Sequence, residues 1–430
     1  MLINRLKSSS FMKDTLLTFI TQLIVMFLGF IVNKILAVKF GVADFGVFNI
    51  AKRGGTVISF ILLMGLGISI PRYLSMSFVQ NKNTGAKYFS NAVLIIFFNS
   101  LLAFLLGLLF EKRFSIILFG TNNYSNLTIP IIIFAIGITM NTFIYAAFRG
   151  SGLYVLFSIS QIVGQSLVMF SIFMGSSVKS VIFLWGIISI LFTLALALIV
   201  VLKRNSQYDM FEVSFKFYYH ELKELIIYGA PRIVGEIIQF SYYLIPLIII
   251  NNKYSAHQTG IFSASTGILQ MFLPFFSYLG LILLPYVSAS IANKNFANVD
   301  RRISQLIFIY LCFAFGAIIF GYLFTDFLLK LLYSSEFLNS ENVVRILLFT
   351  LAPRSIFLLL RNPIDAISKI PYNTLLLVIS LIIQLTCMIN ATTITLIAWS
   401  FVISDLCLAI GSVILWFLLK RKYRGNYEES

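Results

Sequence analysis

Apolar runs long enough to cross a lipid bilayer recur along the whole length of this 430-residue chain. A membrane-spanning helix needs about 20 consecutive apolar residues. The chain is 59% hydrophobic and 11% charged, whereas soluble domains average about 45–50% apolar and about 25% charged residues. The pattern therefore predicts an all-α integral membrane protein. We expect about twelve spans, at residues 14–36, 45–70, 88–110, 127–147, 153–175, 179–202, 225–250, 259–289, 303–325, 342–361, 372–391 and 394–418.

Lysine and arginine are unevenly divided between the loops on the two sides of these spans. Twenty of them lie on the side of the chain termini and six on the opposite side. Because cytoplasmic loops are enriched in Lys and Arg, we expect both termini in the cytoplasm. The formal net charge of +16 then reflects the Lys and Arg residues of the cytoplasmic loops, and nucleic acid is not an expected partner. The six on the opposite side are Lys39, Lys112, Arg113, Lys179, Lys253 and Lys330.

The longest loop divides the chain into two halves of six spans. Residues 203–224 alternate Phe211, Val213, Phe215 and Phe217 with polar residues, which predicts a strand-like or interfacial segment lying on the membrane. We therefore expect an N-terminal six-helix bundle at 1–202, a cytoplasmic linker at 203–224, a C-terminal six-helix bundle at 225–418 and a cytoplasmic tail at 419–430.

The two halves also show a weak internal repeat. A shift of 214 residues aligns span two with span eight, and the identical pairs lie at both ends of the helix. Parallel repeats of this kind are a transporter architecture, with the substrate site between the halves. The matches place Gly46, Phe48, Ile68 and Pro71 on Gly260, Phe262, Ile282 and Pro285.

Three stretches carry glycine, proline and aromatic residues in a recurring order. They are Phe40–Asn49 followed by Gly65–Tyr73, then Tyr228–Gly235, then Gly260–Ala264 running to Leu283–Pro285. In order and spacing these stretches resemble the Wzx-type oligosaccharide flippases. That family is the polysaccharide transporter branch of the multidrug, oligosaccharidyl-lipid and polysaccharide exporter (MOP) superfamily. The resemblance covers essentially the whole chain. It departs at 241–246, where many relatives carry an acidic–basic pair and this chain has no charge.

The resemblance implies both a fold and a function. The fold would be two six-helix bundles arranged as a V around a central cavity, as in MATE-like exporters. Relatives move undecaprenyl-diphosphate-linked oligosaccharide repeat units across the bacterial inner membrane for O-antigen or capsule assembly. The implied partners are the lipid-linked oligosaccharide, membrane lipids, a polysaccharide polymerase and a chain-length regulator. No cofactor is expected, and H⁺ or Na⁺ movement is the implied driving force.

Eight charged residues inside the predicted spans, away from the span ends at Asp14, Lys179 and Arg361, are candidates for function, because a charge in the membrane costs several kcal/mol and tends to face water or a partner. Six are cationic, which suits a diphosphate, because Arg binds phosphate oxygens with two parallel donors and Lys acts as a point charge. These six are the expected substrate-binding residues, and the two carboxylates are the expected ion- or proton-coupling residues. The cations are Lys34, Lys52, Arg53, Arg232, Arg345 and Arg354, and the carboxylates are Glu236 and Asp405.

Arg53 is the favoured phosphate contact in span two. Its neighbour Lys52 points about 100° away around the helix, so only one of the two faces the cavity. The alternative is that both side chains snorkel to the outer interface. Snorkelling is the favoured interpretation for Lys34, which lies near the outer end of span one.

The two carboxylates leave alternatives open. Arg232 and Glu236 are four residues apart and share a helix face. They form either an internal ion pair or a working pair in which Arg232 binds diphosphate and Glu236 takes up a proton when the cavity is empty. Asp405 either pairs with Arg345 or Arg354 or acts as a second proton carrier.

Several functions are disfavoured by what the sequence lacks. It contains no GxxxxGK[ST] loop, no HExxH motif and no cluster of Cys and His with metal-ligand spacing. An enzyme or a metalloprotein is therefore not expected. An ion-coupled multidrug or metabolite antiporter of the MATE branch is the alternative with the same architecture. A polysaccharide polymerase is less favoured, because such enzymes carry a large external loop that this chain lacks.

Overall fold

In a computed structural model the chain is mainly helical in the residues that the structure describes, which are 9–80, 82–202, 211–292, 296–368 and 370–428. These described residues contain α-helices and two short 3₁₀ helices but no strand. The prediction of an all-α membrane protein is confirmed. Contacts divide the chain into two compact units, called here unit 1 (residues up to 256) and unit 2 (residues 257–430).

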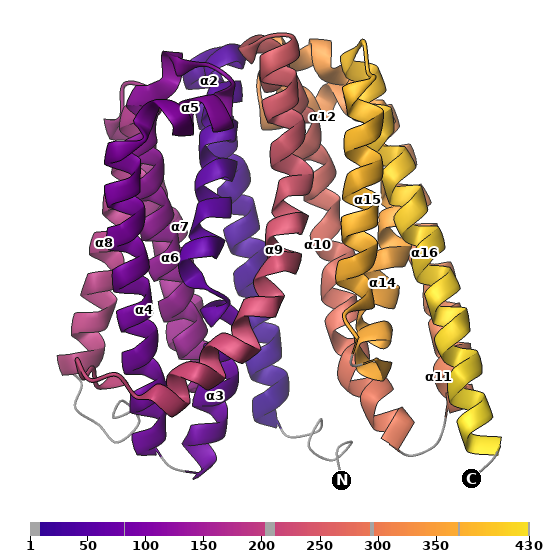
Figure 1. Cartoon of the computed structure of the whole chain (residues 1–430). Helices are drawn as coiled ribbons and strands as arrows, with labels where there is room; N and C mark the ends of the chain where they lie inside the picture. The colour runs from indigo at the N-terminus through magenta and orange to yellow at the C-terminus, as the bar shows by residue number, and fades with distance from the viewer. Residues whose placement is uncertain (1–8, 81, 203–210, 293–295, 369, 429–430) are drawn as a thin grey trace. The chain divides into compact units, whose positions relative to one another are not determined.

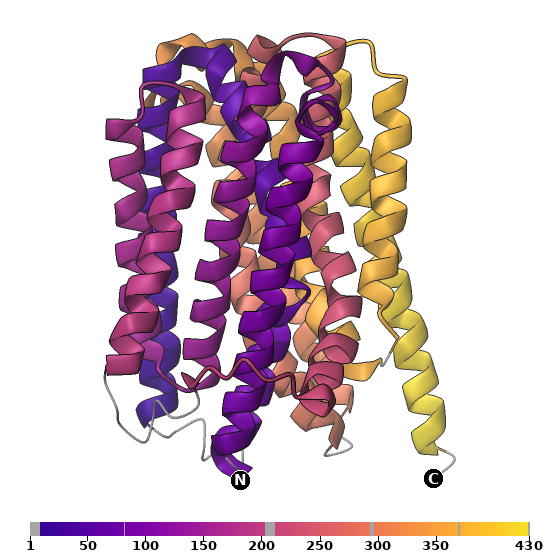
Figure 2. The ribbon, with the colours of Figure 1, turned by 60° about the vertical axis from the view of Figure 1, so that its left-hand side comes forward.

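Unit 1 is a bundle of long helices with an aromatic and aliphatic core (Figures 1 and 2). Helix α6 lies at its centre and packs against α2, α3, α4, α7 and α8. Its elements are α2 (Ser9–Leu63), α3 (Leu66–Gln80), α4 (Lys82–Leu109), α5 (Glu111–Phe119), η1 (Asn122–Leu127), α6 (Thr128–Gly150), α7 (Tyr154–Met174), α8 (Val178–Leu202) and α9 (Tyr219–Lys253).

Unit 2 is built in the same way from seven helices and one 3₁₀ turn. Helix α16 packs along α13, α14 and α15, and α11 packs against α13 and α14. Its elements are α10 (Ala256–Ala292), α11 (Phe296–Leu323), α12 (Thr325–Leu332), η3 (Ser335–Ser340), α13 (Glu341–Leu348), α14 (Leu351–Ile367), α15 (Tyr372–Ile389) and α16 (Ile394–Glu428).

The number of membrane crossings follows from two interrupted helices. Ten helices among the described residues are long and apolar enough to cross a membrane, and the pair Ser335–Leu348 with Leu351–Asp365, bent by 49°, is an eleventh candidate. Helix α2 has 55 residues and is broken at Gly41, where φ is 69°. Because one crossing needs about 20 residues, α2 is long enough for two, and about twelve crossings stays the prediction.

The second arm of α2 is interrupted again where it meets α3. Met64 and Gly65 adopt positive φ angles of 47° and 76° and separate the two helices. The Asn99 side chain on α4 donates a hydrogen bond of 2.9 Å to the Leu62 carbonyl in the last turn of α2. This bond satisfies one of the backbone carbonyls that a helix end leaves without an intrahelical donor. The break between α2 and α3 is therefore stabilised by a hydrogen bond within unit 1.

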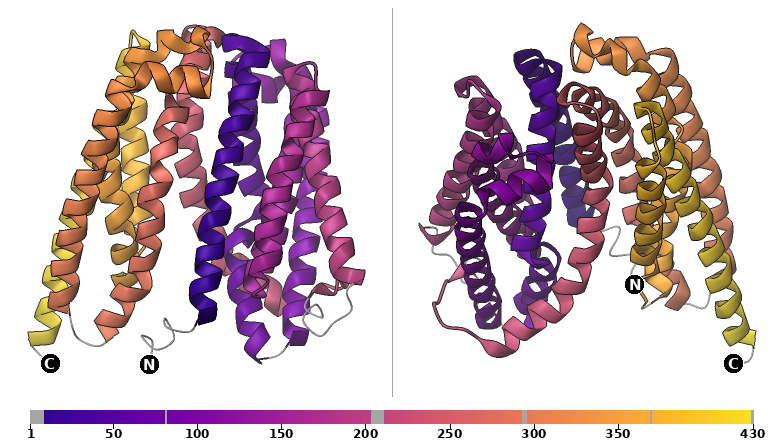
Figure 3. Two further views of the ribbon diagram at one scale, coloured as in Figure 1. Left: turned by 180° about the vertical axis from the view of Figure 1, so that it is seen from behind. Right: turned by 45° about the horizontal axis from the view of Figure 1, so that its top comes forward.

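Helix α9 bends close to the same level, as Figures 1 and 3 show. Pro231 lies inside the helix, and a proline there removes a backbone hydrogen bond and kinks the axis. Two residues earlier, Gly229 packs against the backbone of Met64 and Gly65. The bend of α9 thus lies against the break between α2 and α3.

The described part of the linker, residues 211–224, contains no strand, contrary to one of the two forms expected for it. Residues 212–218 form an extended coil that runs along one end of unit 1 (Figure 2). Phe211 is buried against Phe89 and Phe148, whereas Val213, Phe215 and Phe217 are exposed. One aromatic anchor and three exposed apolar side chains fit the interfacial form of the prediction.

The division between the units differs from the predicted division into halves. Six spans per half places residues 225–250 with the C-terminal bundle. In the structure α9 packs against α2, α3 and α4 and lies within unit 1, and the units divide between residues 256 and 257. The internal repeat and the equal halves stay predictions.

Candidate functional site

Lys52 and Arg53 lie side by side on the second arm of α2 and point to different neighbours. The Lys52 Nζ atom lies 5.3 Å from the ring centroid of Trp185 on α8. The Arg53 guanidinium lies 5.5 Å from the ring centroid of Tyr243 on α9. Both cations thus lie within reach of a cation–π interaction inside the apolar bundle of unit 1. The expected divergence of the two side chains is observed.

Arg232 turns toward Tyr228, one helical turn earlier on α9, and not toward Glu236. Its guanidinium lies 3.7 Å from the Tyr228 ring centroid and donates a hydrogen bond of 2.6 Å to the Tyr228 carbonyl. The described contacts of Arg232 are with Tyr228, and both alternatives for Arg232 and Glu236 stay predictions. The side chain of Arg232 is exposed, and that of Glu236 is half-buried.

A second guanidinium reaches the same tyrosine from another helix. Arg72 on α3 lies 4.3 Å from the Tyr228 ring centroid. Tyr73, the next residue, meets Tyr228 edge to face at 5.9 Å and stacks on Tyr88 of α4 at 4.8 Å. Three helices therefore contribute to one cluster of tyrosine and arginine side chains.

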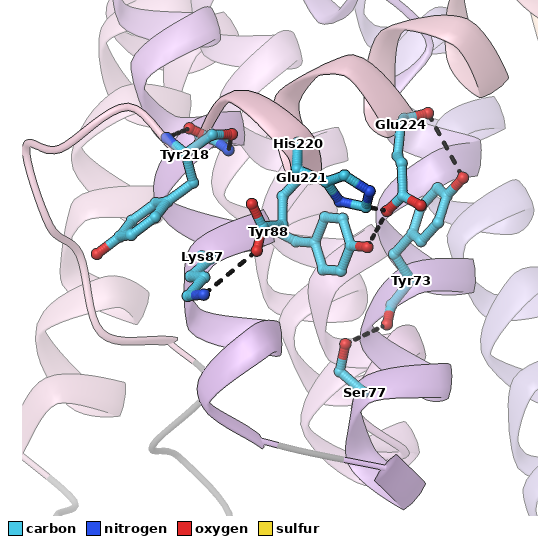
Figure 4. A network of polar contacts seen from close by, with 9 residues as sticks. Tyr73, Ser77, Lys87, Tyr88, Tyr218, His220, Glu221 and Glu224 are labelled. Carbon is cyan, nitrogen blue, oxygen red and sulfur yellow. Dashed lines mark hydrogen bonds and ion pairs between the residues drawn. The ribbon is translucent and has the colours of Figure 1, made fainter.

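A polar network holds the start of α9 beside this cluster, as Figure 4 shows. The Tyr88 hydroxyl donates to the Glu224 carboxylate, and His220 lies 3.9 Å from the same carboxylate. Lys87 pairs with Glu221 at 3.4 Å. These contacts join α4 to the first turns of α9.

The linker is tied to α4 by the two residues that follow Phe89. Asn91 donates to the Tyr218 carbonyl at 2.8 Å and accepts from the Tyr218 amide at 3.1 Å. Ser90 donates to the Glu212 carbonyl at 3.0 Å and accepts from the Ser214 amide. The linker, α4 and α9 are therefore held together by hydrogen bonds at this end of unit 1.

In unit 2 a buried ion pair joins α14 and α16. Arg354 and Asp405 are 3.5 Å apart, and their side chains are 7% and 1% exposed. Next to this pair, Ser380 on α15 donates to the Ser404 carbonyl at 2.8 Å. Of the partners expected for Asp405, the structure selects Arg354. The proton-carrier role for Asp405 stays a prediction.

The remaining two predicted cations lie apart from these clusters. Arg345 on α13 pairs with Glu341 in the preceding turn and lies 4.7 Å from the Tyr322 ring centroid. Lys34 is half-buried on the first arm of α2. Their expected substrate contacts stay predictions. Within the described residues no group of three or more His, Cys, Asp or Glu could hold a metal ion.

Of this cluster the sequence predicted only Arg232 as a site residue. Arg72 is one of the cations on the side of the chain termini, and Tyr228 belongs to one of the stretches rich in glycine, proline and aromatic residues. A signal existed, because Tyr228 and Arg232 have the four-residue spacing of helix neighbours. The approach of Arg72 depends on how α3 packs against α9, and that packing has no local signature.

No protein-family model matches the chain, and no curated protein matches its sequence. Solved structures match over nearly its whole length. An inward-facing multidrug resistance MATE family transporter of the MOP superfamily has a TM-score of 0.77 at 13% identity, over 94% of this chain and 96% of that one. A MOP superfamily transporter from Pyrococcus furiosus has a TM-score of 0.67 at 14% identity, over 96% of each chain.

A Vibrio cholerae MATE transporter is also similar, with a TM-score of 0.63 at 16% identity, over 97% of this chain and 99% of that one. Identities this low concern the fold, and they do not separate the Wzx-type branch from the MATE branch. These neighbours are described as transporters, and the expectation that this chain is not an enzyme stays a prediction. The chain is thus a multi-pass membrane protein with the fold of MATE and other MOP superfamily transporters.

Proposed function

We propose that this chain is a secondary transporter that moves undecaprenyl-diphosphate-linked oligosaccharide repeat units across the bacterial cytoplasmic membrane. The observation that carries the proposal is the pair Lys52 and Arg53, two adjacent cations within a membrane-crossing arm of α2. In the described part of the chain, no carboxylate lies within ion-pair distance of the Lys52 ammonium. Such a pair favours an anionic substrate over the organic cations expected of a drug antiporter.

In a transporter of this fold, the sign of the charges inside the membrane indicates the charge of the substrate. The Pyrococcus furiosus neighbour is described by a reversed polarity of its binding pocket, which suggests a different function for it. The spans predicted from the sequence hold six candidate cations against two carboxylates, and this excess supports the same kind of argument here. A diphosphate is the group whose negative charge and acceptor oxygens such cations complement best.

Alternating access is the mechanism we propose. MATE family transporters with this fold have been solved in inward-facing and outward-facing conformations. Arg53, the favoured phosphate contact of the two, would bind the diphosphate while the lipid tail stays in the bilayer. Asp405 is our candidate for H⁺ or Na⁺ coupling, because its protonation would release Arg354. Replacement of Asp405 by Asn should then abolish the dependence of transport on an imposed ion gradient.

The test begins in a host deleted for this gene. We expect the deletion to remove the surface polysaccharide and to accumulate its lipid-linked precursor. Complementation with Lys52→Ala/Arg53→Ala should fail, and the charge-preserving Lys52→Arg/Arg53→Lys variant should restore part of the export. Lys179→Ala, which removes an exposed cation at the start of α8, serves as the matched control. Membrane levels of each variant are measured in parallel.

Two outcomes would reject the proposal in different ways. Unchanged surface polysaccharide in the deletion host, together with increased sensitivity to cationic drugs, would favour the MATE-type antiporter. Full export by the double alanine variant would show that these two cations do not carry the substrate. Loss of export only in variants with reduced membrane levels would place Lys52 and Arg53 among the residues that stabilise the fold.

A further inference from the structure

Two exposed guanidinium groups share the ring of Tyr228. Arg232 comes from the same helix and Arg72 from α3, and their distances to the ring centroid are 3.7 and 4.3 Å. The two guanidinium groups are therefore no farther apart than about twice the longer of these two distances. Like charges this close repel each other unless an anion lies nearby. The arrangement is one that a bound anion would stabilise.

No described carboxylate neutralises the two arginines. Within the described part of the chain, neither Arg72 nor Arg232 lies within ion-pair distance of an Asp or Glu side chain. The carboxylates beside them have other partners, since Glu224 accepts from Tyr88 and Glu221 pairs with Lys87. Arg232 already donates one N–H to the Tyr228 carbonyl, and Arg72 interacts with the Tyr228 side chain, so the remaining guanidinium N–H groups are the donors that would serve a ligand.

The platform beneath the arginines is held in place from several sides. Tyr73 packs against the Tyr228 ring and stacks on Tyr88. One residue after Tyr228, Gly229 lies against the backbone of Gly65, which fixes α9 against the start of α3. Such support holds the Tyr228 ring, which both arginines contact, and preorganised groups bind with less loss of entropy.

The position of the cluster indicates how the ligand is presented. By the distribution of Lys and Arg, this end of α3 and α9 is the predicted cytoplasmic end. Next to it lies the linker, whose Phe215 and Phe217 side chains are exposed, as expected of a segment at the membrane interface. A ligand that reaches the cluster along the membrane surface would be a lipid that carries its anionic group at the interface.

We infer that Arg72, Tyr228 and Arg232 form a docking site for the phosphate group of a lipid at the cytoplasmic face of the membrane. Guanidinium groups bind phosphate oxygens through two parallel donors, and a shared aromatic ring fixes the plane of each. The lipid is either a polyprenyl diphosphate or a bulk anionic phospholipid. The inference goes beyond the proposed function, because docking is a binding event that is measured without transport.

The experiment is native mass spectrometry of the purified full chain, offered undecaprenyl diphosphate, undecaprenol or phosphatidylglycerol. We expect the wild type to retain undecaprenyl diphosphate about tenfold to a hundredfold more strongly than Arg72→Gln/Arg232→Gln, since charged hydrogen bonds are lost. Tyr228→Leu, which removes the shared ring, should weaken binding in the same direction. Undecaprenol, which lacks phosphate, should bind all variants equally.

Lys223→Gln is the matched control, because it removes an exposed cation from the same end of α9. It should bind lipid as the wild type does. If the glutamine variant loses phosphatidylglycerol and undecaprenyl diphosphate alike, the site serves bulk phospholipid. If it loses only the diphosphate, the site serves the polyprenyl lipid. Both results support the site.

Equal retention of both phosphate lipids by the wild type and the double glutamine variant would overturn the inference, as would an equal loss in Lys223→Gln. If the double variant does not fold, Arg72→Lys/Arg232→Lys decides. That variant keeps both charges and lacks the planar fork, so reduced binding supports the site and unchanged binding overturns it. Failure of the surface-polysaccharide test would leave these results unaffected, so the two proposals fail separately.

Discussion

Gly65 and Gly229 pack backbone against backbone where α2 gives way to α3 and where α9 bends. A Cβ atom on Gly65 would overlap the carbonyl group of Gly229, and one on Gly229 would lie 2.9 Å from the Met64 carbonyl oxygen. Gly65 also has a φ of +76°, a conformation that L side chains rarely adopt. This contact sets the distance between the helices that carry Arg72 and Tyr228.

Replacement of Gly65 by Ala should destabilise the protein by about 2 kcal/mol or more, because backbone strain and overlap are added together. Gly152→Ala is the control, since Gly152 has a φ of +72° but no atom within 4 Å of an added Cβ. Thermal unfolding in one detergent compares the two variants. Equal losses would mean that the contact with Gly229 contributes nothing beyond the backbone conformation.

The buried ion pair of unit 2 should respond asymmetrically to substitution. Arg354→Met leaves the Asp405 carboxylate, which is 1% exposed, without its cation, and removing one partner of a buried pair costs about 3–5 kcal/mol. The double variant Arg354→Met/Asp405→Leu should recover much of that loss, since no buried charge remains. A double-mutant cycle from thermal unfolding measures the coupling. Strictly additive effects would exclude a stabilising pair.

Phe211 and Phe215 should differ in their effect on stability although both belong to the linker. Phe211 is 3% exposed within a cluster of aromatic side chains, whereas Phe215 is 88% exposed. Phe211→Ala should cost about 3 kcal/mol or more, and Phe215→Ala should leave thermal unfolding in detergent nearly unchanged. A large effect of Phe215→Ala alone would show that this side chain packs against the protein.

Topology is checked by labelling single cysteines from each side of the membrane. After Cys312, Cys387 and Cys407 are replaced by Ser, a cysteine is introduced at Lys223 or at Lys179. Both positions are exposed, and they belong to loops predicted on opposite sides. We expect an impermeant thiol reagent added to intact cells to modify position 179 and to spare position 223. The reverse pattern would invert the predicted orientation.

The sequence by itself determined the class of the fold and the position of nearly every crossing. A run of about 20 apolar residues is a local property, because each crossing helix must be long and apolar enough by itself to span the bilayer. The different directions of the Lys52 and Arg53 side chains also follow from a local rule, since neighbours on a helix point about 100° apart. Their contacts with Trp185 and Tyr243 lie on different helices, as that divergence requires.

Tertiary structure decided which residues meet. The sequence offered Arg345 and Arg354 equally to Asp405, and packing of α14 against α16 selected Arg354. The helical spacing suggested Glu236 for Arg232, and the structure turned that side chain to Tyr228, where Arg72 joins it from α3. These pairings depend on helix rotation and on breaks at Gly41, Gly65 and Pro231. Many contacts between helices together determine these pairings, so no single stretch of sequence encodes them.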